Sequence, residues 1–133
     1  MSRGEQRLRD YLGHILQAIE RIDRYTGDKS KAAFLCNEMA QDAVVRNLEI
    51  LGEASHNIEQ RFPEFAGAHP ELPLAAAYQM RNAVAHGYFS VDFDIVWKTI
   101  HSDLPALYAG VQALVDGLPE ERNEASGDDS ADA

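Results

Sequence analysis

The sequence has a single cysteine among its 133 residues and no long apolar run. One thiol cannot form an intramolecular disulfide or a thiolate metal site, which excludes a disulfide-stabilised domain and a zinc ribbon. No stretch approaches the roughly 20 apolar residues of a bilayer span, and the N-terminus lacks the apolar segment of a secretion signal. We therefore expect a cytoplasmic protein without a membrane partner, in which Cys36 is a small buried hydrophobic residue.

Basic residues are also scarce, since 12 lysines and arginines stand against 22 acidic residues for a net charge of −10. About half of this charge lies in residues 119–133, which contain six acidic residues, one arginine and almost no large apolar side chains. That composition predicts an acidic, disordered tail over 119–133 after one helical domain over 1–118. The net negative charge argues against a broad nucleic-acid-binding surface but is compatible with a local basic cleft.

Several catalytic and metal-binding motifs are missing as well. The sequence has no glycine-rich phosphate loop, no His-Glu-x-x-His motif, no nucleophile elbow and no Cys–His pair at a useful spacing. Its five histidines do not cluster, and no set of Glu and His residues has the spacing of a metal site in a helical bundle. We therefore expect neither a bound metal nor a cofactor.

Apolar residues at alternating spacings of four and three predict two helices in the first half of the chain. The first ends near Gly27 and has the stripe Leu8, Leu12, Ile15, Ile19 and Ile22. The second is longer, is capped by Asp28 or Ser30, and stops at Pro63. The small residues on its stripe predict close helix packing; the stripe consists of Ala40, Val44, Asn47, Leu51, Ala54 and Ile58.

The second half continues the helical pattern after a loop predicted over 62–73, where prolines and a glycine gather. A helix is expected over 74–86 with Gly87 as its C-terminal cap. Asp92 or Asp94 should open the next helix, with Val96, Trp97, Ile100 and Leu104 facing inward, and Pro105 should kink it or start a fifth segment. With no strand pattern, the predicted fold is all-α: an antiparallel bundle of four or five helices.

The segment from Met80 to Phe89 contains the candidate site. It places Arg81, Asn82, His86 and Tyr88 within a few residues, separated by small or aliphatic side chains. Asn82 and His86, four residues apart, share one helix face, so the amide can hydrogen-bond the imidazole and set its tautomer. Arg81 and His86, five residues apart, point in different directions, and two copies about a two-fold axis would bring both pairs to one cleft.

These residue types suit cleavage of RNA without a metal. Histidine can take a proton from a ribose 2′-hydroxyl or give one to the leaving 5′-oxygen, and arginine can hold the phosphate and stabilise its developing charge. The spacing also has a purely structural interpretation. Arg81 would then be a solvated cation at the helix end, His86 part of the C-terminal cap, Asn82 an exposed polar residue and Tyr88 a half-buried bundle residue.

A family resemblance favours the catalytic interpretation. Arg81-Asn82-x3-His86-x-Tyr88 resembles the Arg-x4-His-x-Tyr motif of the HepT-like HEPN ribonucleases, the toxins of MntA/HepT toxin–antitoxin pairs. The resemblance covers nearly all of residues 5–115 in order, through Arg7–Asp10 with Ile15 and Ile19, Ala43–Ala54, Met80–Phe89, Ile95–Ile100 and Asp103–Leu107. It departs at Pro73-Leu74, where this family often carries Pro-Trp.

The resemblance implies a HEPN-like fold over residues 1–118 and a site at a homodimer cleft. Arg81 and His86 would be catalytic, and Asn82 would support His86. Tyr88 would accept AMP from ATP, transferred by a partner MntA-like nucleotidyltransferase antitoxin, and the added charge and bulk would silence the toxin. In the second helix, Gly52 would permit tight helix contact and Glu53 would pair with a cation, a packing role being expected for both.

Two functions from different classes follow. The first is a metal-independent endoribonuclease toxin with an RNA substrate, neutralised by AMPylation of Tyr88. The second is a catalytically weak helical binding subunit, a homodimer or higher oligomer that recruits the nucleotidyltransferase and binds nucleotide or RNA without cutting it. The presence of both Arg81 and His86 favours the first, because a scaffold does not need them.

Overall fold

The computed structural model describes residues 3–86 and 91–118, and of His86 it describes only the backbone. Within these residues the chain forms helices and no strand, which confirms the predicted all-α class. Five helices have ten or more residues and two are short. In order they are α1 (Arg3–Thr26), α2 (Lys31–Leu35), α3 (Glu38–Arg61), α4 (Pro63–Ala68), α5 (Leu74–His86), α6 (Phe93–Ser102) and α7 (Leu104–Gly117).

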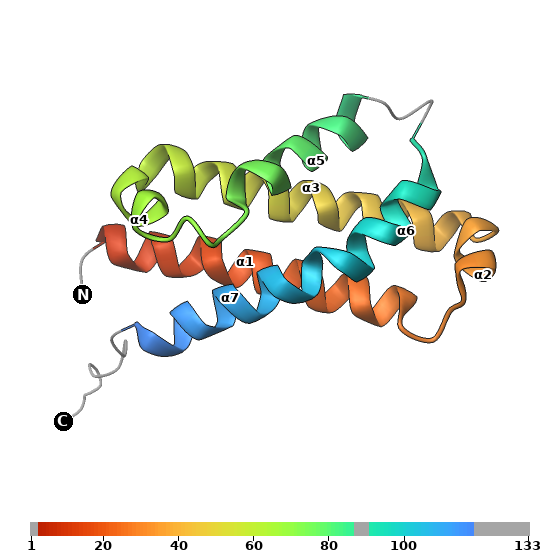
Figure 1. Cartoon of the computed structure of the whole chain (residues 1–133), viewed down its shortest axis with the longest axis horizontal. Coiled ribbons are helices and arrows are strands. Elements are labelled where there is room, and N and C mark those ends of the chain that lie inside the picture. Colours follow the sequence, from red (N-terminus) through yellow and green to blue (C-terminus); the bar gives the residue numbers. More distant parts are fainter. Residues whose placement is uncertain (1–2, 87–90, 119–133) are drawn as a thin grey trace.

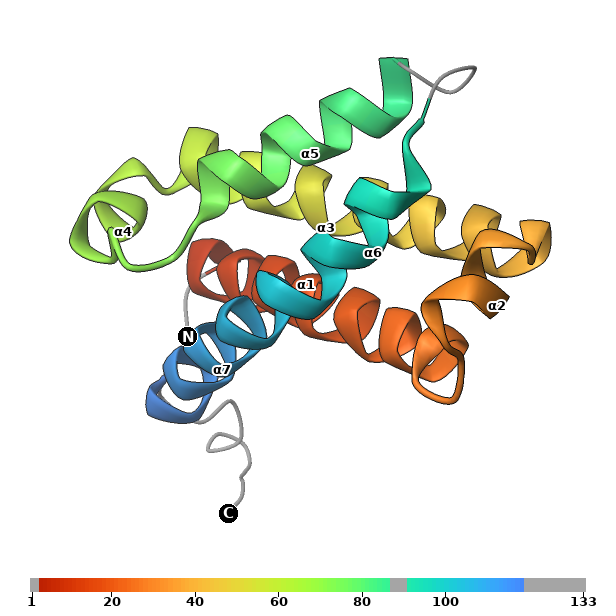
Figure 2. The same ribbon diagram turned by 45° about the vertical axis from the view of Figure 1, so that its right-hand side comes forward.

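The long helices pack side by side in an antiparallel arrangement. Helix α5 packs on α3, α3 packs on α1, and α1 packs on α7, as Figure 1 shows. Helices α6 and α7 follow each other across the molecule in nearly one direction, and α2 joins α3 to α6 at one end (Figure 2). The start of α1 and the end of α7 lie at the same end of the molecule. None of the helices described here is long and apolar enough to cross a bilayer.

The predicted apolar stripes form the core. On α1, four of the five stripe residues are buried and Leu8 is half-buried. On α3 all six are buried, as expected from a stripe that faces α1 and α5. Burying the aliphatic members of these two stripes is the main contribution to the stability of the bundle, at about 25 cal/mol per Å² of apolar surface.

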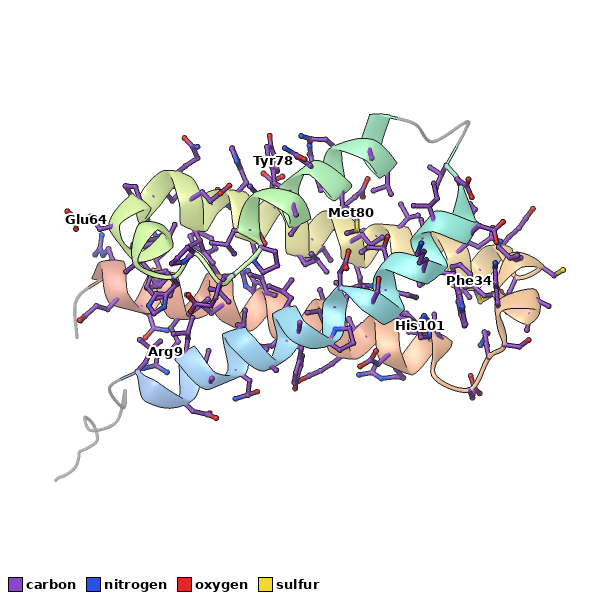
Figure 3. All side chains as sticks on the ribbon, in the orientation of Figure 1. Arg9, Phe34, Glu64, Tyr78, Met80 and His101 are labelled. Atoms are coloured by element: carbon purple, nitrogen blue, oxygen red, sulfur yellow. The ribbon has the colours of Figure 1, made fainter. Side chains whose placement is uncertain are left out.

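The predicted cap of the long second helix was wrong. The Asn37 side chain caps α3 by accepting a hydrogen bond from the Ala40 amide at 2.9 Å, while Ser30 caps the short α2 through Ala33 at 3.1 Å. The chain breaks between the two helices because Phe34 is buried against α6, with ring-centroid distances of 6.1 Å to Phe93 and 5.3 Å to Trp97 (Figure 3).

Two further predictions need correction. Residues 62–73 are not all loop, since Pro63 starts α4; the first position of a helix needs no backbone donor, so proline fits there. Cys36 is exposed at the C-terminal end of α2 rather than buried. It lies at the break between two helices, where the chain turns at the surface.

The later helices agree with the sequence. Helix α5 has the predicted bounds, and Leu74, at the departure from the family pattern, is buried at its start. The Asp92 carboxylate caps α6 by accepting from the Asp94 amide at 3.0 Å. Val96, Ile100 and Leu104 are buried, Trp97 is half-buried, and Pro105 lies in the first turn of α7. The expected Gly87 cap and the tail over 119–133 fall outside the described residues.

Candidate active site

Helix α5 carries Arg81, Asn82 and His86 and lies very close to α3. The close approach occurs at Gly52, where an added β-carbon would overlap the Cβ of Arg81 and come within 2.9 Å of the Ala77 carbonyl oxygen. No residue larger than glycine fits there without moving one of the helices. The predicted role of Gly52 in tight helix contact is therefore confirmed, and the contact places the Arg81 backbone directly over α3.

Two polar groups hold the Arg81 side chain. Its Nε lies 3.4 Å from Oε1 of Glu53, and its Nη1 donates a hydrogen bond to Oδ1 of Asn82 at 2.9 Å. Glu53 thus pairs with a cation, whereas the sequence had favoured a packing role for it. The Arg81 side chain is 30% exposed, and Nη2 has no hydrogen-bond partner in the described part of the chain. A fixed and half-exposed guanidinium of this kind can bind an anion with its remaining donors.

The structure brings only some of the predicted site residues together. Arg81 and Asn82 are in contact, whereas the expected contact between Asn82 and His86 falls on a side chain outside the description. His86 is the last residue of α5, and Tyr88 lies among the residues that are not described. Because α5 is helical over both residues, Arg81 and His86 leave the axis about 140° apart.

A cleft of about 500 Å³ opens beside Arg81, between α1 and α3. Sequence reasoning missed this feature, because most of its lining residues lie more than 20 positions from the motif. One signal was present in the sequence: polar residues of α3 recur at spacings of three and four beside the apolar stripe. The lining residues are Tyr11, His14, Arg46, Glu49, Ile50, Glu53, Ala54, Asn57 and Arg81.

No group of three or more His, Cys, Asp or Glu residues that could hold a metal ion occurs in residues 3–86 and 91–118. The cleft contains Glu49, Glu53 and His14, but Glu53 is paired with Arg81, and Arg46 and Arg81 place two positive charges on the same lining. The chemistry available at this site is anion binding by arginine, together with the acid–base chemistry of histidine at the end of α5.

Comparison with known proteins identifies the family. Residues 15–114 match the family described as Ribonuclease HepT-like. The chain belongs to this family. The matched segment contains Arg81, Asn82 and His86, together with the α3 residues of the cleft, so the family resemblance drawn from the motif is confirmed over most of the chain.

The relatives agree with the family match. A protein of Thermococcus cleftensis named "Probable ribonuclease HepT" is 43% identical over 106 residues, covering 80% of this chain and 94% of that protein. "Putative RNase TTE0752" of Caldanaerobacter subterraneus is 35% identical and "Putative RNase MJ1380" of Methanocaldococcus jannaschii is 33% identical. They cover 80% and 78% of this chain and 93% of their own lengths. No solved structure gives a significant match to the chain.

Proposed function

We propose that this HepT-like protein is a metal-independent endoribonuclease, the toxin of a toxin–antitoxin pair, with its activity in the helical domain over residues 1–118. The observation that carries the proposal is the fixed, half-exposed guanidinium of Arg81, which lies within the segment that matches this ribonuclease family. One ion pair, with Glu53, and one hydrogen bond, to Asn82, orient the guanidinium in advance. This lowers the entropic cost of binding a phosphate in one geometry.

In the proposed reaction, His86 takes the proton from the ribose 2′-hydroxyl, and the 2′-oxygen attacks the adjacent phosphorus. The bond to the 5′-oxygen of the next nucleotide breaks, and that oxygen receives a proton from a second imidazole or from water. The products are a 2′,3′-cyclic phosphate and a 5′-hydroxyl. Arg81 stabilises the negative charge that develops on the non-bridging oxygens.

The divergence of Arg81 and His86 supports a dimeric site. Because positions 81 and 86 of α5 are about 140° apart around the helix axis, one copy would present the two side chains poorly to a single phosphate. In a two-fold dimer, Arg81 of one copy and His86 of the other can face the same phosphate. We propose that the active form is a homodimer or a higher oligomer built from such dimers.

Tyr88 is the proposed site of control. Two residues beyond the end of α5, its phenol oxygen would attack the α-phosphorus of ATP on a partner MntA-like nucleotidyltransferase antitoxin, releasing pyrophosphate. The attached AMP adds negative charge and bulk near the site, which would repel RNA. The unmodified protein would be the active toxin, and the AMPylated protein the silent form.

The decisive experiment incubates purified protein with mixed RNA in excess EDTA and maps the ends of the products. Intact mass must first show that Tyr88 carries no AMP, because the modification would hide the activity. We expect cleavage that leaves cyclic phosphates, is lost in Arg81→Ala and His86→Ala, and persists in His101→Ala, a matched control at an exposed histidine of α6.

Failure of unmodified protein to cut, or cutting that is unchanged in His86→Ala, would contradict this proposal. A dimer that binds RNA and the nucleotidyltransferase without cutting would instead establish the weakly catalytic binding subunit.

A further inference from the structure

The cleft beside Arg81 is lined by more polar and charged side chains than cleavage of a phosphodiester requires. Arg46, Glu49, Glu53 and Asn57 follow one another at spacings of three and four and form one polar stripe along α3. From Arg46 to Asn57 the stripe is about 16 Å long, because a helix rises 1.5 Å per residue. Arg81 meets it at Glu53, about 10 Å along the axis from Arg46.

We propose that this cleft binds a nucleotide of the RNA strand next to the phosphate held by Arg81. This inference rests on the ribonuclease function proposed above and names how the same site takes its substrate. Arg46 contacts a neighbouring phosphate, the base lies over Ile50 and Ala54 with one end against Tyr11, and Glu49 and Asn57 bond to opposite edges of the base.

The charges on the lining favour a nucleotide over a simple anion. Arg46 is exposed and makes no ion pair within residues 3–86 and 91–118, so its guanidinium is available to a phosphate. Glu49 would repel an isolated phosphate, but its carboxylate can accept hydrogen bonds from base amino and imino groups. The Asn57 amide can both donate to a base edge and accept from it.

The apolar part of the lining also suits a base. Tyr11 lies at the Asn57 end of the cleft, since its ring meets that of Phe62 edge-on at 6.4 Å, just beyond the end of α3. Half-buried Ile50 and buried Ala54 form the floor between the two polar ends. Single-stranded RNA is bound in this way, with bases stacked on aromatic side chains and phosphates on cations.

The size of the cleft is consistent with this ligand. Its volume of about 500 Å³ falls within the usual range of about 300–1,000 Å³ for small-ligand sites. Both α1 and α3 are long and packed on each other, so the cleft is formed by rigid elements. It is contained within one copy of the chain, in contrast to the two-copy site proposed for catalysis.

The first test measures binding of a short oligoribonucleotide with a single mapped cleavage site and a 2′-O-methyl group that prevents cutting. Arg46→Ala should raise the Kd about tenfold and reduce the slope of log affinity against log salt by about one. Arg61→Ala is the matched control: it removes the same charge from an exposed position on α3 outside the cleft. It should change the Kd less than twofold, and circular dichroism should show that both variants remain folded.

The second test addresses the base. Asn57→Ala and Glu49→Gln should reduce the preference for the base beside the cleavage site about tenfold while cleavage itself continues. If Arg46→Ala and Arg61→Ala weaken binding equally, or if neither base-edge variant alters the preference, the cleft proposal is wrong although the ribonuclease stands. If AMP binds in an Arg46-dependent way and the RNA does not, the cleft is a mononucleotide site and the proposal is also wrong. If unmodified wild-type protein neither binds nor cuts RNA, both proposals fail.

Discussion

Gly52 of α3 lies directly beneath Arg81 of α5, so closely that a β-carbon on Gly52 would overlap the first carbon of the arginine side chain. The next residue of α3, Glu53, then reaches the Arg81 guanidinium from the side. One glycine thus sets the distance between the two helices, and its neighbour orients the cation. Residues almost thirty positions apart in the sequence combine to hold one functional group.

Replacing Gly52 with alanine should destabilise the protein and impair the site. Overpacking of a close contact costs about 1–3 kcal/mol, which exceeds the gain of about 0.5–1 kcal/mol that alanine brings to a helix interior. Displacement of Arg81 by about 1 Å should lower cleavage on the order of 100-fold. Urea denaturation and the RNA-cleavage assay measure the two effects.

Gly13→Ala is the matched control, because a β-carbon at this exposed position of α1 meets nothing within 4 Å. This variant should gain about 0.5–1 kcal/mol of stability and cleave RNA normally. Equal unfolding free energies for the two alanine variants would show that the Gly52 contact is not tight.

Glu53 should act as a positioning residue for Arg81 rather than as a source of stability. Its side chain is 53% exposed, and exposed ion pairs contribute about 0–1 kcal/mol. Glu53→Ala should therefore leave the melting temperature nearly unchanged but lower kcat about tenfold with little effect on KM. Glu53→Gln, whose amide oxygen can take the place of the carboxylate oxygen beside Nε, should restore part of the kcat.

The control for this prediction is Glu59→Ala, which removes a carboxylate from the same helix outside the cleft. A similar kcat loss in Glu59→Ala, or no rescue by Glu53→Gln, would count against a positioning role.

Asp92→Ala should destabilise the start of α6. The Asp92 carboxylate accepts hydrogen bonds from the amides of Asp94 at 3.0 Å and Ile95 at 3.4 Å, and loss of such a cap costs about 1 kcal/mol. Thermal melts should show the loss in Asp92→Ala and near-normal stability in Asp92→Asn, whose side-chain oxygen still caps the helix. Identical melts for the alanine and asparagine variants would mean that the cap contributes nothing.

The contact between α7 and α1 should respond to high pH. The Tyr108 hydroxyl donates a hydrogen bond to Oε2 of Glu20 at 2.7 Å, and this bond raises the pKa of Tyr108 above its ordinary value of 10.0. Only the protonated phenol can donate this hydrogen bond. The bond therefore stabilises the folded protein fully below the ordinary tyrosine pKa, and this stabilisation is lost as the pH rises through the raised pKa of Tyr108 in the folded protein.

Ultraviolet titration of the wild type and of Tyr108→Phe, compared by difference, should isolate the Tyr108 phenol. Glu20→Gln should move the pKa of Tyr108 down toward its ordinary value, because the hydrogen bond to a carboxylate and the charge of that carboxylate are both gone. A Tyr108 pKa that does not change in Glu20→Gln would argue against the hydrogen bond.

The long helices could be predicted from the sequence because a helix that buries one face needs apolar residues at every third or fourth position. Ile15, Ile19, Val44 and Leu51 all face the core as their spacing indicates. The bounds of α5 followed from Pro73 before the helix and Gly87 after it. The break at Cys36 could not be predicted, since it depends on Phe34 packing against rings on α6, about sixty positions later in the chain.

Part of the candidate site could likewise be predicted from the sequence, and part depends on the tertiary structure. Arg81, Asn82, His86 and Tyr88 are close in the sequence, so the motif could be seen without the structure. Together with the resembling segments over residues 5–115 it pointed to the HepT-like family, which the family match confirms. The pairing of Arg81 with Glu53 and the cleft lined by Tyr11 and Arg46 depend on how α1, α3 and α5 pack. Helical periodicity and a local motif are determined by residues close in the sequence. Contacts between helices form only when the whole apolar core is buried at once.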